Sequence, residues 1–127
     1  VHFQNGSIKL SSAAMPPIYH FEKKNKKVDE IQLSNLPLGG LMNESFSVID
    51  KKFGKDDVLV MISDGLPEAP NKKGELLDYE AVKKCIEENG YKSANEIKNE
   101  LVKLSETWLD GIHNPDDITI VVCKKKV

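Results

Sequence analysis

Two stretches decide the fold, VLVMISDG at residues 58–65 and DDITIVV at residues 116–122. Each is an unbroken apolar run with acid beside it, since Asp64 follows the first run and Asp116 and Asp117 precede the second. Continuous runs of valine, isoleucine and leucine are typical of strands that are buried on both faces. We therefore expect both stretches to form central strands of a sheet.

The aspartates beside these runs are the candidate functional residues. If the two strands run antiparallel, the end of the first and the start of the second lie at the same edge of the sheet. That arrangement gathers Asp64, Asp116 and Asp117 where no lysine is close in sequence. Clustered carboxylates repel one another unless a hard divalent cation lies among them. The sequence therefore predicts a metal site, in which Gly65 permits a sharp exit that leaves Asp64 beyond the sheet edge.

Each aspartate alone also has a simpler interpretation, because an aspartate at a strand end can cap a turn. Only the pair at one edge favours a cation. Mg²⁺ or Mn²⁺ fits best, since these ions need only a few carboxylates and several waters, and the Cys and His set that zinc prefers is missing. About 23 Å of extended strand separates Asp57 from Asp64, so we expect Asp57 to be a turn residue at the far end. His20 belongs to no recognisable cluster.

Composition excludes several classes of function. The 127 residues fit one compact domain, and a formal net charge of −2 gives no general attraction to nucleic acid. All 18 basic residues are lysines, so no guanidinium is present to bind phosphate bidentately. No apolar run reaches membrane-spanning length, and we expect a cytoplasmic protein without membrane insertion. The lysine-rich tip at 23–27 is interpreted as a solvated loop rather than as an anion-binding patch.

The order of the remaining patterns predicts an α+β fold. Hairpins are expected over residues 1–10, with a type I′ turn, and over residues 18–33; a strand over residues 45–53 then precedes the first central strand. Two helices begin at Asp78 and Ser93, the second with a capping box. Strands, then helices, then one returning strand indicate helices on one face of a largely antiparallel sheet.

Four motifs in a fixed order carry a resemblance to a known family. They are SSAAMPP at residues 11–17, PLG at 37–39, DDVLVMISDGLPEAPN at 56–71 and DDITIVV at 116–122. Together they resemble the C-terminal part of the PPM family of metal-dependent serine/threonine protein phosphatases, in its bacterial stage II sporulation protein E branch. Ala14 departs from the pattern because it stands where that family usually has glycine.

The resemblance implies an antiparallel β-sandwich flanked by helices, with two Mn²⁺ or Mg²⁺ ions at one end. Asp64 and Asp116 correspond to two metal aspartates of the family, and Asp117 corresponds to the hydrogen-bonding neighbour of the second. Gly39, in the Pro-Leu-Gly loop, is expected to border the cleft. Glu68 matches a Glu-Ala pair of the family, but the resemblance gives it no role.

The implied function is metal-dependent hydrolysis of phosphoserine or phosphothreonine on a protein in bacterial signal transduction, commonly an anti-anti-sigma factor. An early Gly-Asp motif that supplies a bridging metal ligand in the family has no match in residues 1–10. Residues 1–127 therefore resemble about the last two-thirds of a phosphatase domain, and an upstream sensor or receiver domain is expected in the parent protein. The alternative is a non-catalytic regulatory or protein-binding module, either degenerate or truncated.

Overall fold

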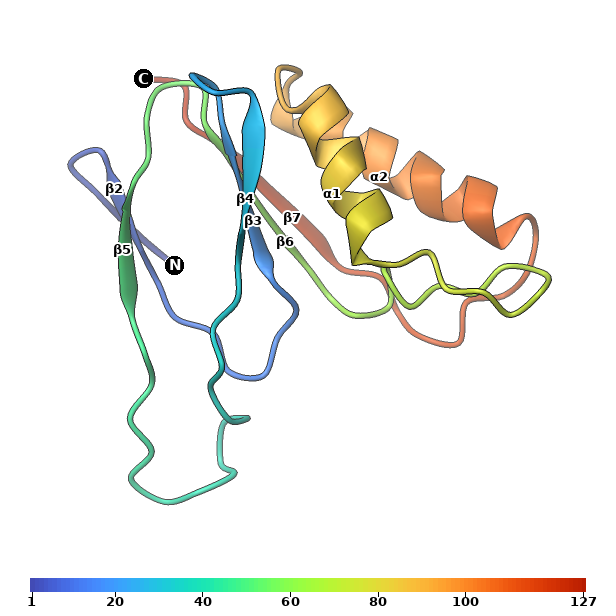
Figure 1. Cartoon of the computed structure of the whole chain (residues 1–127), viewed down its shortest axis with the longest axis horizontal. Coiled ribbons are helices and arrows are strands. Elements are labelled where there is room, and N and C mark those ends of the chain that lie inside the picture. Colours follow the sequence, from blue (N-terminus) through green and yellow to red (C-terminus); the bar gives the residue numbers. More distant parts are fainter.

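The computed structural model describes residues 1–127 and arranges them in three layers, a small sheet, a large sheet and a pair of helices (Figure 1). The strands are β1 (His2–Gln4), β2 (Ser7–Leu10), β3 (Ile18–Glu22), β4 (Lys27–Ile31), β5 (Ile49–Lys52), β6 (Val58–Ile62) and β7 (Ile120–Lys124), and the helices are α1 (Tyr79–Asn89) and α2 (Ala94–Leu109). The small sheet has the order β1-β2-β5, the large sheet has the order β4-β3-β6-β7, and every pairing is antiparallel. The expected α+β fold, an antiparallel sandwich with flanking helices, is confirmed.

Strand β6 lies at the centre of the structure, which explains its unbroken apolar sequence. Val58 and Val60 belong to a core cluster shared with both helices, whereas Leu59 belongs to a second cluster between the two sheets. All three side chains are fully buried. Because alternate residues of a strand point to opposite faces, a strand with a core on each side needs apolar residues throughout.

The local signals at turns and helix ends were predicted correctly. Asn5 and Gly6 both have positive φ, at 44° and 81°, as a type I′ turn requires. Asp78 accepts hydrogen bonds from the first turn of α1, and Ser93 forms the reciprocal capping box of α2. Neither helix combines the length and the apolar composition that crossing a membrane requires.

Helix α1 ends directly on the large sheet. Gly90 follows the helix with φ of −59°, a conformation open to any residue. Its small size is needed for a different reason, since a Cβ at this position would lie 2.5 Å from the ring of Phe21 on β3. The glycine therefore sets how closely the end of α1 approaches the sheet.

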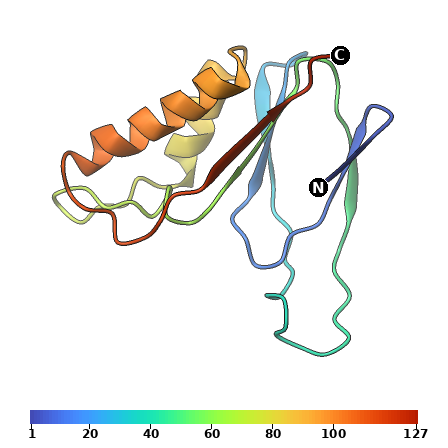
Figure 2. The same ribbon diagram turned by 180° about the vertical axis from the view of Figure 1, so that it is seen from behind.

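Two predicted strands differ from those observed. The structure limits the expected strand over residues 45–53 to β5, because β2 offers no partner beyond the Leu10–Ile49 pair, and Ser47 N instead donates to Asn35 Oδ1 over 3.1 Å. The second apolar run begins its strand only at Ile120. As the edge strand of the large sheet, β7 is half-buried, so the expectation that it would be covered on both faces is wrong. Figure 2 shows β7 from this open side.

Asp57 lies at the end of β6 that is remote from Asp64, as expected, but it is a buried residue and not a simple turn residue. Its carboxylate accepts hydrogen bonds from Gly54 N at 2.7 Å and Lys23 N at 2.9 Å. His20 Nε2 lies 3.3 Å from the same carboxylate, and the His20 side chain is only 1% exposed. The view that His20 belongs to no cluster is therefore also wrong. The Asp57 carboxylate thus links the turn before β6 to the turn before β4 and to His20 on β3.

Candidate metal centre

The pairing of β6 with β7 brings the two halves of the predicted site to one edge of the sheet. The strands are antiparallel, and Ile62 pairs with Ile120 at the end of the ladder. One further hydrogen bond, from Ser63 N to Thr119 O at 3.0 Å, extends the pairing beyond the strands. Asp64 follows this bond on one chain segment and Asp116 precedes it on the other, so the backbone places both at the same end.

Ser63 holds the two loops together through its side chain. Its hydroxyl accepts a hydrogen bond from Thr119 N at 2.9 Å and donates one to Asp117 O at 3.1 Å. Asn114 adds a third link by donating to Gly65 O over 2.8 Å. The backbones beside the acidic residues are thus fixed relative to each other by short polar contacts from both loops.

Gly65 is required for this close approach. A Cβ at this position would lie 2.3 Å from Asp117 O, a separation that real Cβ atoms do not reach. The sequence pattern gave a different reason for this glycine, a sharp turn, whereas its role in the structure is to let the Asp116–Asp117 backbone pass directly against it. Asp117 therefore contributes through its carbonyl group, which contacts both Ser63 and the space beside Gly65.

We predict that Gly65→Ala lowers the free energy of unfolding by about 2 kcal/mol, because the added methyl group forces the two loops apart. Urea denaturation followed by circular dichroism measures this loss. Gly111→Ala is the matched control, since Gly111 has φ of 83° but open space around it, so only backbone strain is added there. If Gly65→Ala lowers the free energy of unfolding no more than Gly111→Ala does, the close approach of the Asp117 backbone to Gly65 does not contribute to stability.

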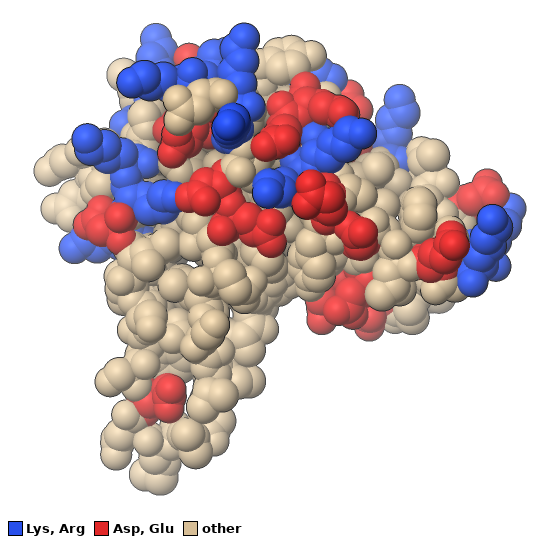
Figure 3. Space-filling model, viewed as in Figure 1, with Lys and Arg blue, Asp and Glu red and all other residues tan.

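The acidic side chains at this end form no ion pairs. Asp64, Glu68, Asp116 and Asp117 are all exposed, and none of the five ion pairs in the structure includes them. On the face shown in Figure 3, lysines gather along the upper edge, whereas acidic atoms without adjacent lysines lie along the lower edge beneath the helices. Mg²⁺ and Mn²⁺ prefer hard oxygen ligands, and unpaired carboxylates supply them.

Asp64 also lines a surface hollow of about 480 Å³. Glu68, Glu30 and Tyr79 also line this hollow, as does the Pro-Pro turn. Burial, followed by the negative charges of Glu68 and Asp64, raises the pKa of Tyr79. Its phenol therefore stays protonated and remains a hydrogen-bond donor next to the carboxylates.

Sequence reasoning assigned no role to these three neighbours of Asp64. Glu68 could have been found, because a residue four positions after Asp64 returns to the same side in a helical turn, and Glu68 N does donate to Asp64 O over 3.0 Å. Glu30 and Tyr79 come from β4 and α1, so only the tertiary structure brings them here.

The donor set fits a hard divalent cation but is incomplete. No three side chains among His, Cys, Asp and Glu lie close enough together to hold an ion. Asp64 and Asp116 thus offer two carboxylates, while Glu68 and Glu30 line the hollow together with Asp64. The assignment of Asp64 and Asp116 as metal ligands stays a prediction.

Gly39 lies apart from these residues. It sits on an exposed loop with φ of 80° and has no neighbour within 4 Å of a Cβ built on it. It does not line the hollow of Asp64; the adjacent Leu38 instead lines a separate apolar groove with Met61 and Ile62. The structure therefore does not bring Gly39 together with the acidic pair.

The fold and the two acidic loops were compared with those of known protein families. The family model for stage II sporulation protein E (SpoIIE) matches residues 1–126. The chain belongs to this family, whose solved relatives are PP2C-type phosphatase domains.

Two curated relatives are similar over most of the chain. The phosphoserine phosphatase RsbU of Bacillus subtilis (strain 168) is 30% identical over 121 residues, which are 92% of this chain and 34% of the relative. The stage II sporulation protein E of Priestia megaterium is 32% identical over 105 residues, covering 82% of this chain and 17% of the relative. The chain thus spans about a third or less of either protein.

Two solved structures show the same fold. The PP2C phosphatase domain of SpoIIE from Bacillus subtilis, solved with a fragment of its regulatory domain, superposes with a TM-score of 0.73 at 29% identity over 91% of this chain and 33% of that one. The Mn-presoaked phosphatase domain of the same protein gives 0.71 at 26% identity over 95% of this chain and 51% of that one. The matched part is thus about half of that solved chain.

Proposed function

We propose that residues 1–127 are the C-terminal portion of a SpoIIE-like phosphatase domain, and that the complete domain hydrolyses phosphoserine or phosphothreonine on a bacterial regulatory protein. The observation that carries this proposal is the β6–β7 pairing, which puts Asp64 and Asp116 at one sheet edge without a lysine partner. Membership of the SpoIIE family and the similarity to a phosphoserine phosphatase support it.

The residues of this chain would act as ligands and as their supports. When bound, two Mn²⁺ or Mg²⁺ ions supply an activated water and neutralise charge on the phosphoryl oxygens. Asp64 and Asp116 would hold this positive charge, while Ser63 and Gly65 keep their loops in contact. The chain has no arginine that could bind a phosphoryl oxygen. The protonated phenol of Tyr79 lines the hollow and would donate a hydrogen bond to that oxygen instead.

The partner implied by the family resemblance is a phosphorylated anti-anti-sigma factor in a cytoplasmic signalling pathway. An upstream sensor or receiver domain would control the phosphatase.

The second candidate is a non-catalytic regulatory or protein-binding module. It is favoured by one observation, that the chain assembles no group of three ligands for a metal ion. The two candidates predict different behaviour for a longer protein. In an enzyme, a further carboxylate from outside residues 1–127 would complete the metal site, whereas in a non-catalytic module it would not.

We therefore predict that the 127-residue chain binds Mn²⁺ weakly and has almost no phosphatase activity, whereas the complete protein turns over at least about 100-fold faster. The reason is that a doubly charged ion with fewer anionic ligands is held less tightly. Titration calorimetry with Mn²⁺ and p-nitrophenyl phosphate turnover measure both quantities.

The control for binding is Asp50→Asn, which changes an exposed carboxylate on β5 and should leave the Mn²⁺ affinity unchanged. Strong Mn²⁺-dependent turnover by the short chain would contradict the expectation of an incomplete site. A complete protein that binds Mn²⁺ but cleaves neither p-nitrophenyl phosphate nor a phosphoprotein would favour the non-catalytic module.

A further inference from the structure

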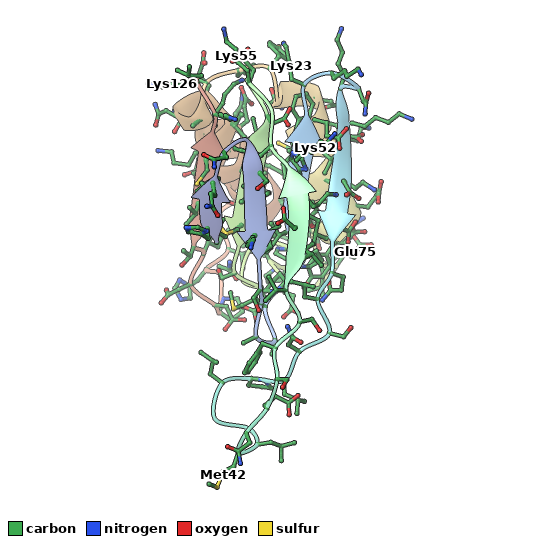
Figure 4. All side chains as sticks on the ribbon, turned by 90° about the vertical axis from the view of Figure 1, so that its left-hand side faces the viewer. Lys23, Met42, Lys52, Lys55, Glu75 and Lys126 are labelled. Atoms are coloured by element: carbon green, nitrogen blue, oxygen red, sulfur yellow. The ribbon has the colours of Figure 1, made fainter.

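The end of the sheets opposite the candidate metal centre carries lysines from three distant segments. These are the β3–β4 turn at residues 23–27, Lys55 in the β5–β6 turn and the stretch at residues 124–126, together called the lysine end here. Backbone contacts join the segments, since Asp56 N donates to Lys125 O at 2.8 Å and Lys23 N donates to the Asp57 carboxylate. Figure 4 shows Lys23, Lys55 and Lys126 together at this end, remote from Met42.

Most of this positive charge is uncompensated. The lysines of the lysine end without an ion pair include Lys23, Lys24, Lys26, Lys27, Lys55 and Lys126. The nearby Asp57 is buried and already accepts two backbone hydrogen bonds. The lysines of these three joined segments thus outnumber the acidic side chains beside them, of which Asp56 is partly exposed.

Two hollows open among these lysines. The first, of about 420 Å³, is lined by Phe3, Phe53 and Lys125, and the two phenyl rings lie 5.5 Å apart with Phe3 48% exposed. The second, of about 370 Å³, is lined by Tyr91, by lysines that include Lys126, and by one acidic residue, Asp56. The lysine end therefore combines positive charge with concave apolar surface.

We propose that the lysine end docks a short acidic segment of another protein, with an apolar side chain of that segment packed against the exposed ring of Phe3 in the first hollow. Carboxylates of the segment pair with the lysines of the two turns and of residues 124–126, and complementary charge sets its orientation. This site is separate from the proposed phosphatase centre and does not depend on it.

The same features disfavour larger polyanions. Electrostatic interactions are screened over about 8 Å at physiological ionic strength. A short segment bound at the lysine end therefore interacts mainly with the lysines. A membrane or a nucleic acid extends further and is also repelled by acidic residues elsewhere on the chain, whose net charge is −2. A flat bilayer cannot fill the Phe3–Phe53 hollow. The absence of arginine also removes the bidentate contacts that phosphate groups favour.

The test uses a fluorescein-labelled peptide of alternating glutamate and glycine with a central phenylalanine, and fluorescence anisotropy with the 127-residue chain. The triple variant Lys23→Glu, Lys55→Glu, Lys126→Glu should bind it at least about tenfold more weakly. The matched control Lys73→Glu, Lys84→Glu, Lys103→Glu makes the same charge change at exposed positions elsewhere and should stay within about twofold of wild type. Phe3→Ser should abolish the preference over a peptide whose phenylalanine is replaced by serine.

Melting curves test whether each variant is folded, and we expect folded variants because the three substituted side chains of the lysine end make no hydrogen bond or ion pair. The proposal is overturned if the wild type does not bind the peptide, if the control triple weakens binding as much, or if the two peptides bind equally. Tighter binding to phosphatidylserine vesicles or to duplex DNA than to the peptide, at equal ionic strength, would also overturn it.

Discussion

Asp64→Asn, introduced into the complete protein, is expected to lower Mn²⁺-dependent dephosphorylation by about 100-fold or more while leaving the fold intact. Asparagine keeps the shape of the side chain and one acceptor oxygen but removes the negative charge that holds a cation. The loss therefore falls on metal occupancy and on stabilisation of charge in the transition state. Turnover of a phosphoserine peptide over a range of Mn²⁺ concentrations measures it.

The melting temperature in EDTA separates this role from a structural one. Without metal, Asp64 lies in an unpaired acidic group, so removing its charge should leave the melting temperature unchanged or raise it, because like charges repel. Asp50→Asn serves as the control for the loss of one exposed carboxylate. If Asp64→Asn keeps near wild-type activity, or loses activity only by unfolding, Asp64 is a turn residue and the proposed metal centre fails.

Asp57→Ala is expected to lower the free energy of unfolding of the chain by about 3 kcal/mol. The substitution removes a buried carboxylate and leaves Gly54 N and Lys23 N without their acceptor, and unsatisfied buried donors are costly. It also leaves His20 beside the vacated space with its Nδ1 already lacking a partner. Urea denaturation of the wild type and the variant measures the difference.

The matched control is Asp50→Ala, which deletes the same group from an exposed strand position and should change stability by less than about 0.5 kcal/mol. A loss at Asp57 no greater than at Asp50 would mean that water replaces the carboxylate fully. Such a result would remove the support for a buried polar contact that joins the β3–β4 and β5–β6 turns.

The elements with local signals were predictable from sequence. The Asn5-Gly6 turn and the caps at Asp78 and Ser93 depend on residues within a few positions of each other. The β6–β7 arrangement was predictable because acid stands after one apolar run and before the other, which specifies a shared edge once the strands are antiparallel.

The remaining features depend on packing between distant segments. An apolar run does not reveal whether its strand is central or at the edge, so the half-burial of β7 was missed. The contact of His20 with Asp57 joins residues 37 apart in sequence, and the neighbours of Asp64 in its hollow come from separate elements. Gly65 was assigned a turn role because the backbone that passes beside it is more than 50 residues away.

The absence of a side chain at Gly90 has a mechanical consequence for the far end of α1. The helix has 11 residues and is therefore about 16 Å long, and its first residue is Tyr79. A larger residue at position 90 would press on Phe21 and tilt the helix away from β3, and a tilt of about 10° moves the opposite end by about 3 Å. The width of the hollow beside Asp64 is thus set in part by a contact at the other end of the helix, and substitutions there would reshape it without touching any residue that lines it.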